Sequence, residues 1–419
     1  MTFPLLSRPR VDRASQCRPA LALLLCLATL PLTAEPRHSA DLVFPLERWH
    51  NHGSCIVEAP NGALIVCWFH GSGERKADDV VILGSRLDPN NERWTPPFLL
   101  ADTPGFPDTN CCMIVDPKER LWLFWPTIQA NLWESALMNY KISSNYLVPK
   151  KAPVWETEKV LHMKPGAAFP DTVRRKTAEY LSHTTLSPRA IEWASHNFQQ
   201  ADDKLTRRIG WFTRAHPYIT ENGRMLVGLY SDGFSFSMVA YTDDWGNQWR
   251  FSEPIVGGGN IQPSFARTQE GLLVAYMRDN GPPPKRVHVS ESNDEGETWS
   301  KVYDHPQLFN PGAGLELMNL QDGRMLAIYN DTERGRHRLA VSISDNDGKS
   351  YPITRHLEAV NPGEGSFHYP SIIQTKDGML HATYSYFVND PVSGESVKSI
   401  KHATFTVDWV EAGNDSPQE

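Results

Sequence analysis

A histidine and two arginines occupy places where the chain could carry out acid–base and anion-binding chemistry. His52 ends the polar and aromatic run of residues 49–52, and an imidazole that titrates near neutral pH can act as an acid or a base. Arg278 and Arg336 fall at matched places in neighbouring repeats. Because a guanidinium pairs bidentately with a carboxylate, the two arginines predict a site for an acidic ligand.

Other side chains are expected to line the same site. Four of them are polar and stand at the start of further predicted strands: Asp108, Asn110, Arg214 and His216. Most tryptophans of a β-rich chain pack between sheets, and the exceptions expected to stack on a sugar are Trp125 and Trp133.

These residues are carried by a β-hairpin that recurs along the chain. The hairpin turns are the pairs Asn61-Gly62, Asn222-Gly223, Glu270-Gly271, Asp322-Gly323 and Asp377-Gly378, each followed by an apolar strand. A repeat of about 50 residues is typical of the four-stranded blades of a β-propeller. Residues 160–210 lack the repeat and are expected to form an insertion or an irregular blade, with a short helical segment near 172–179.

A second repeat marks the turns between outer strands. Residues 292–299 fit the Asp-box pattern S-x-D-x-G-x-T-W at every defined position, and weaker copies begin at Thr242 and Ser344. In such a turn the Ser and Asp side chains bind the amides of the turn and Gly takes a positive φ. The sequence therefore predicts an all-β fold, a β-propeller whose length allows six or seven blades, formed as one domain by residues 35–419.

Composition restricts the partners. The 419 residues carry a net charge of −8, and residues 1–34, which contain four arginines and an apolar run, resemble a secretory signal peptide cleaved near Ala34. We expect a secreted or periplasmic, acidic protein that binds neither nucleic acid nor, beyond the signal peptide, a membrane. Cys55 and Cys67 face each other across the turn at Asn61, either as a disulfide or as two buried thiols. No cysteine spacing fits a zinc site, and we expect neither metal nor cofactor.

The chain resembles the sialidase-like superfamily, in particular the predicted neuraminidases with BNR/Asp-box repeats. The resemblance covers roughly residues 45–405 and is carried by the Asp boxes and by segments such as 260–264, 330–338 and 368–371. It implies a six-bladed propeller with the site at the centre of one face.

The resemblance also assigns roles to matching residues. Tyr369 matches the nucleophile, Arg278 and Arg336 match two arginines of a carboxylate clamp, and Asp79 matches the acid/base. A tyrosine nucleophile is the known exception to the two-carboxylate rule for glycosidases. Two further residues of the same loop are implied in the site, Asp78 as the alternative acid and Arg75 as a substrate contact.

Two positions depart from the family pattern. His52 stands where the first clamp arginine is expected, and Gln262 stands where a glutamate would activate the tyrosine. Glutamine cannot take a proton, so Tyr369 needs another base, for which Glu316 is the candidate. The substrate-binding set is then Arg75, Asp78, Arg214, Gln262, Arg278 and Arg336.

Three functions follow from this set. The leading hypothesis is a secreted, exo-acting glycoside hydrolase on an acidic or related terminal sugar of a carbohydrate substrate. The first alternative is a polysaccharide lyase, in which His52 and Tyr369 remove a proton beside a uronate carboxylate. The second is a carbohydrate-binding propeller without turnover.

Overall fold

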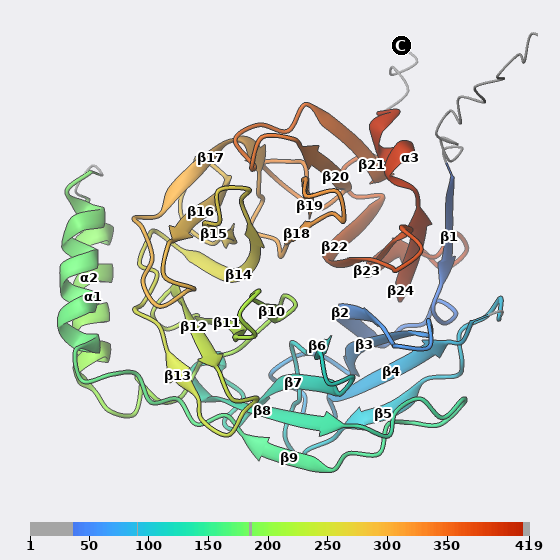
Figure 1. The fold of residues 1–419 in the computed structure, drawn as a ribbon, viewed down its shortest axis with the longest axis horizontal. Coiled ribbons are helices and arrows are strands. Elements are labelled where there is room, and N and C mark those ends of the chain that lie inside the picture. Colours follow the sequence, from blue (N-terminus) through green and yellow to red (C-terminus); the bar gives the residue numbers. More distant parts are fainter. Residues whose placement is uncertain (1–36, 90, 184–186, 414–419) are drawn as a thin grey trace, which may run out of the picture. The chain divides into compact units, whose positions relative to one another are not determined.

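Six antiparallel sheets of four strands each form in the residues that the computed structural model describes, 37–89, 91–183 and 187–413. Figure 1 shows the sheets set around a common centre, and strands near that centre contact strands of neighbouring sheets. The arrangement is a β-propeller, as the hairpin repeat predicts, and it has six blades. Each hairpin turn joins neighbouring strands, so the chain runs outward through each sheet before it begins the next.

The strands fall into blades in chain order. The first two blades contain β2 (His50–Glu58), β3 (Leu64–Gly71), β4 (Val81–Leu87), β5 (Phe98–Ala101), β6 (Cys112–Val115), β7 (Leu121–Ile128), β8 (Ala136–Ser143) and β9 (Thr157–Val160). The next two contain β10 (Tyr218–Ile219), β11 (Met225–Ser231), β12 (Phe236–Thr242), β13 (Arg250–Phe251), β14 (Asn260–Arg267), β15 (Leu273–Asp279), β16 (Arg286–Ser292) and β17 (Tyr303–Phe309). The fifth contains β18 (Glu316–Asn319), β19 (Met325–Tyr329), β20 (Arg338–Ser344) and β21 (Ile353–Ala359).

The last blade closes the ring by combining both ends of the propeller. It contains β22 (Gly365–Gln374), β23 (Leu380–Asn389) and β24 (Ser396–Phe405), and its outer strand is β1 (His38–Leu42). β1 pairs antiparallel with β24, with His38 opposite Phe405. A short helix, α3 (Val407–Glu411), follows β24. Because the first strand completes the last sheet, the circle of blades is held by backbone hydrogen bonds.

The Asp box at residues 292–299 has the turn that its sequence predicts. Ser292 Oγ donates to Asp294 Oδ1 at 2.8 Å, and the amides of Gly296 and Thr298 donate to Ser292 Oγ and Asp294 Oδ1. Gly296 has a φ of +83°, and Trp299 is buried. The copies at Thr242 and Ser344 repeat the hydrogen bond to the glycine amide. These turns are structural.

Residues 160–210 form an insertion of two helices. α1 (Phe169–Leu181) and α2 (Pro188–Asp202) lie between β9 and β10 in the chain and stand outside the ring of sheets in Figure 1. Gln200 on α2 donates to the carbonyl of Gly233, and Trp193 donates to that of Phe234. The sequence predicted one short helix here, near residues 172–179, and the structure has a second helix, α2, that was not predicted. A single turn of 3₁₀ helix, η1 (Trp133–Ser135), precedes β8.

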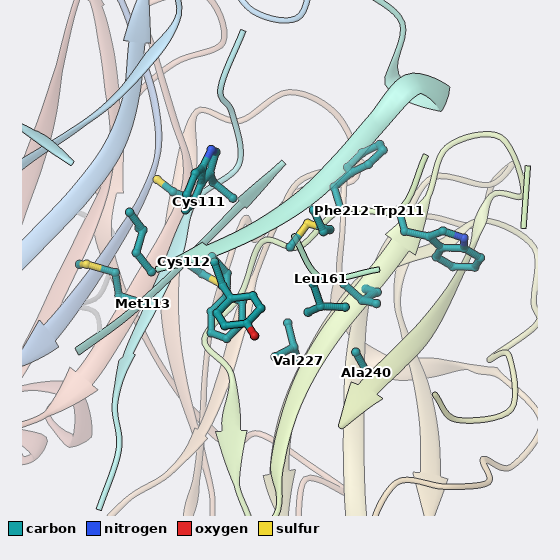
Figure 2. Close-up of a cluster of buried hydrophobic side chains, with 14 of the residues drawn as sticks. Cys111, Cys112, Met113, Leu161, Trp211, Phe212, Val227 and Ala240 are labelled. Carbon is teal, nitrogen blue, oxygen red and sulfur yellow. The ribbon is translucent and has the colours of Figure 1, made fainter. Parts of the chain in front are cut away.

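Buried apolar side chains fill the space between neighbouring blades. Figure 2 shows part of one cluster, in which Cys112 and Leu161 of the second blade meet Val227 and Ala240 of the third. Cys55 lies directly opposite Cys67 on β2 and β3, as predicted. The thiols of the described cysteines are free and buried.

The predicted signal peptide, residues 1–34, lies outside the described residues. Residues Glu35–Glu419 form one compact unit. In the described part of the chain, no helix combines the length and the apolar character needed to cross a membrane.

Candidate active site

Bulges at the same level of three inner strands place side chains at the centre of one face. The pairing register shifts in β2 between His52 and Cys55, and the same shift recurs in β14 and β22. At the bulges, Gly53, Gln262 and Tyr369 have φ values of +65°, +58° and +52°. A left-handed conformation costs a non-glycine residue about 1–3 kcal/mol, and such strain gathers at functional sites. The two strained residues are the ones for which the sequence analysis proposed roles.

The bulges surround a polar cavity of about 240 Å³. Its walls are formed by His52, Glu74, Asn110, Trp133, Phe212, Tyr230, Asp232, Gln262, Arg278, Asn280, Arg336 and Tyr369. The structure thus brings together six residues that the sequence singled out for the site, which are His52, Asn110, Gln262, Arg278, Arg336 and Tyr369. It also places the predicted tryptophan Trp133 in the wall.

Tyr369 is the centre of this arrangement. Arg278 Nη1 donates to its hydroxyl at 2.7 Å, and Gln262 Nε2 donates at 3.3 Å. The guanidinium of Arg336 lies 5.4 Å from the ring centroid. Burial by itself raises the pKa of Tyr369, but the charges of Arg278 and Arg336 and the hydrogen bond from Gln262 outweigh it and hold the pKa below its ordinary value. The site therefore favours the phenolate.

Arg214 supports the tyrosine from beneath the ring. Its guanidinium lies 5.3 Å from the ring centroid of Tyr369, and it donates to the carbonyl of Pro370. Arg214 is 1% exposed, and its Nε and Nη1 have no hydrogen-bond partner among the described residues. Gln262 Oε1 and Arg278 Nε are buried without partners in the same part of the structure. Buried polar atoms are nearly always satisfied, so this cluster indicates a ligand or water site.

His52 contacts Tyr369 on another side. Its ring centroid lies 4.3 Å from that of Tyr369, and Nδ1 shares a 2.9 Å hydrogen bond with Ser385 Oγ. Burial lowers the pKa of His52 well below its ordinary value, and the neighbouring His368 and His50 lower it further. His52 is therefore neutral at physiological pH, and it cannot replace the charge of an arginine.

Two carboxylates in the cavity wall were not predicted. Burial raises the pKa of Asp232, although Arg278 opposes the shift. Asp232 lies between β11 and β12, next to the Gly233 carbonyl that α2 holds through Gln200. Glu74 lies 3.2 Å from His50 Nε2; burial raises its pKa, but the hydrogen bond and charge of His50 prevail and lower it.

The predicted loop acids lie elsewhere. Asp79 is exposed, and its carboxylate accepts hydrogen bonds from the amide and hydroxyl of Ser72. Asp78 accepts from Asn131, and Arg75 stacks on Trp133 at 5.1 Å from the ring centroid. None of the three lines the cavity. The hydrogen bonds from Ser72 hold the carboxylate of Asp79 within its own loop and outside the cavity. The family pattern alone does not reveal these contacts.

Glu316 also lies away from the tyrosine hydroxyl. Its Oε1 accepts from the amide and from Nδ1 of His216, both at 2.9 Å, and its Oε2 accepts from the amide of Ile372. His216 Nε2 lies 2.7 Å from the carbonyl of Ile56. Both ring nitrogens face acceptors, so His216 is an imidazolium paired with an ionised Glu316. The pair joins inner strands of four blades, and it is unsuited to serve as the base for Tyr369.

The repeat held a signal for some of the missed residues. Tyr230, Arg278 and Ser385 each stand seventh after the turn glycine of their hairpin. Tyr230 and Arg278 line the cavity, and Ser385 binds His52. Counting from the turns would therefore have found Tyr230. No group of three or more metal-binding side chains occurs in the described ranges.

Comparison with known proteins agrees with the architecture. The family model of the BNR repeat-like domain matches residues 62–214 and 200–382. The anhydrosialidase of Macrobdella decora is 23% identical over 181 residues, which cover 39% of this chain and 23% of that protein. The match therefore spans less than a quarter of the relative's length.

Solved structures share the fold across most of the chain. A protein of unknown function from Dyadobacter fermentans has a TM-score of 0.62 at 16% identity, covering 88% of this chain and 97% of its own. The intramolecular trans-sialidase of Ruminococcus gnavus has a TM-score of 0.60 at 12% identity, covering 86% of this chain and 95% of its own. The family model covers well over half of the sequence and the fold is that of the sialidase propellers, so the chain belongs to the family of BNR repeat-like domains.

Proposed function

We propose that the protein is an exo-acting glycoside hydrolase that removes an acidic or related terminal sugar from a glycan. The observation that carries the proposal is the buried hydroxyl of Tyr369, which receives a 2.7 Å hydrogen bond from Arg278 inside a small polar cavity. Membership of the family and the sialidases among its structural relatives support the substrate class. We further propose that the protein acts after export, with residues 1–34 as its signal peptide.

Arg278 and Arg336 are proposed to hold the carboxylate of the sugar. Both line the cavity and both lie against Tyr369, so a carboxylate bound between them places the anomeric carbon near the tyrosine. His52, which is neutral, stands where a third arginine is expected. The proposed substrate is therefore a sugar whose carboxylate is bound by two arginines only. The small cavity suits one terminal ring.

Tyr369 is proposed to attack the anomeric carbon. A bond forms between its phenolate oxygen and that carbon while the glycosidic bond breaks, and water later displaces the tyrosine. Gln262 cannot remove the phenolic proton. Instead, Arg278 and Arg336 are proposed to ease the loss of this proton, because their charges lower the pKa of Tyr369.

Asp232 is proposed to protonate the departing oxygen. A general acid must keep its proton near the working pH, and burial raises the pKa of Asp232 in that direction. Glu74, whose pKa is lowered, stays ionised in the same wall and suits electrostatic stabilisation of the developing positive charge.

The test is a direct assay of the purified protein. A fluorogenic sialoside and a panel of uronate polysaccharides are incubated with the protein and with its Tyr369→Phe variant, and released fluorophore and ultraviolet absorbance are followed. Release of the fluorophore, lost in the variant, supports the hydrolase, and so does a rise in reducing sugar from a polysaccharide without a rise in ultraviolet absorbance.

Ultraviolet absorbance is followed because the contact between His52 and Tyr369 is also compatible with a lyase. A neutral His52 beside Tyr369 is also the pair that a lyase would use, and elimination would produce an ultraviolet-absorbing unsaturated uronate. Absorbance that rises in step with new reducing ends, with no fluorophore released from the sialoside, would replace the hydrolase by a lyase, because elimination also exposes one reducing end for each bond that it breaks. Binding without either product would leave a carbohydrate-binding propeller.

A further inference from the structure

A second and larger cavity opens beside the first, between the fifth and sixth blades. Its volume is about 520 Å³, against about 240 Å³ for the cavity at Tyr369. Arg336 lines both, so the two spaces share one wall. Phe387, which also lines the larger cavity, lies 4.8 Å from His368 and 6.0 Å from His52, measured between ring centroids. The two cavities therefore lie side by side: Arg336 lines both, and Phe387 of the larger cavity contacts His52 of the smaller one.

The walls of the second cavity are basic. Arg334 and Arg336 contribute two guanidinium groups and His337 contributes an imidazole, and no aspartate or glutamate lies among the lining residues. None of these three basic residues forms an ion pair with a described residue, whereas Arg224, Arg267 and Arg324 elsewhere on the propeller each do. In a chain of net charge −8, an unpaired cationic hollow indicates an anionic ligand.

The loop that carries the basic residues is fixed to the sixth blade. The buried Asn330 donates to the carbonyls of Arg338 and Phe367, at 2.7 Å in both cases. The amide of Phe367 in turn donates to the carbonyl of Arg336 at 2.7 Å. Arg336 is held further by its hydrogen bond to the carbonyl of Gly312. The cations are thus presented from a positioned backbone, which reduces the entropy lost when a ligand binds.

The remaining wall suits a sugar. Phe387 offers an aromatic surface, and Ser366 and Asn389 offer a hydroxyl and an amide, the mixture found in ligand pockets with a few polar groups. We propose that this cavity is a subsite for the sugar adjacent to the terminal one, and that it selects glycans in which this second sugar also carries an acidic group. The inference rests on the proposed function, because it takes the terminal sugar to lie beside Tyr369.

Equilibrium binding tests the subsite without requiring turnover. Calorimetry is carried out with sialic acid, with its α2,8-linked dimer, and with galacturonic acid and its dimer. The protein is the Tyr369→Phe variant, which lacks the proposed nucleophile and does not consume the dimers, with and without the double substitution Arg334→Ala/His337→Ala. We expect one dimer to bind about tenfold more tightly than its monomer, the gain of one charge-assisted contact, and the gain to disappear in the double variant and to shrink as salt is added.

The matched control is Arg189→Ala, an exposed arginine on α2, which should leave the gain intact. A gain that persists in the double variant overturns the subsite, and so does equal binding of monomer and dimer or no binding of any probe. An absence of hydrolysis, by contrast, bears on the proposed function and leaves the binding result readable.

Discussion

Arg278 donates a 2.7 Å hydrogen bond from Nη1 to the hydroxyl of Tyr369, at the position where the sequence lacks a base. The sequence analysis looked for a carboxylate to activate the tyrosine and selected Glu316. The structure instead gives Tyr369 two donors, Arg278 and Gln262, and no recorded acceptor for its proton among the described residues. A hydroxyl that is held only by donors loses its proton more readily than a free tyrosine, and in the proposed mechanism this effect takes the place of the missing base.

Replacing Arg278 by Gln should therefore raise the pKa of Tyr369. The variant loses the charge that contributes most to the lowering, while burial, which raises the pKa, stays. The ultraviolet difference titration of the variant against its Tyr369→Phe derivative measures this single tyrosine, with Arg189→Gln as control. Turnover should fall about 10²–10³-fold, the usual effect of removing one donor from a charge-stabilising site. An unchanged titration would mean that Arg278 does not set the ionisation of Tyr369.

Asp232→Asn and Asp79→Asn form a matched pair that identifies the proton donor. We expect the Asp232 variant to lose about 10²–10⁴-fold in turnover of a natural glycoside, the usual contribution of a general acid. The loss should be smaller with a nitrophenyl leaving group, which departs without a proton. Asp79→Asn should remain active because its carboxylate binds Ser72 outside the cavity. The reverse result would return the role to the loop at Asp79.

The buried pair of His216 and Glu316 should make stability depend on pH in two directions. Against the effect of burial, the charges of Cys55 and Glu316 raise the pKa of His216 above 6.5, so its contribution is complete below pH 6.5 and is lost as the pH rises through the folded value. The charge of His216 overcomes burial to lower the pKa of Glu316 below 4.5, so that contribution is complete above pH 4.5 and is lost as the pH falls.

The two contributions together place their maximum between pH 4.5 and 6.5. Urea unfolding at a series of pH values should show this maximum, and Glu316→Gln should remove about 3–5 kcal/mol, because it leaves a buried cation unpaired. The control is Glu58→Gln, which makes the same substitution at the end of the inner strand β2. A Glu316 variant of full stability would show that the pair does not hold the blades together.

The sequence was sufficient for the fold because propeller blades are local. Each hairpin turn and each Asp box is defined by residues within one repeat, so the repeat length and the chain length predicted six or seven blades, and the family resemblance favoured six. The cavity is different, since its walls come from strands and loops of several blades. The residue after Asp232, Gly233, is held by Gln200 of α2, and Asp79 is bound by Ser72; neither contact leaves a periodic trace in the sequence.

The substitution Gln262→Glu restores the glutamate that the family pattern has at this position. It tests whether Tyr369 still needs that glutamate as a base or whether Arg278 has made it unnecessary. Gln262 Nε2 donates to the hydroxyls of Tyr230 and Tyr369, and its Oε1 is buried without a partner among the described residues. A carboxylate of the same shape would place a negative charge beside Tyr369, raise its pKa and repel an acidic sugar. We expect kcat/KM to fall at least about tenfold, a penalty of about 1.4 kcal/mol, with the tyrosine titration moved to higher pH. Gln262→Met, which removes the hydrogen bonds without adding charge, should lose less. If Gln262→Glu gained activity instead, a base would be what the site lacks, and the phenolate held by Arg278 would not be the working nucleophile.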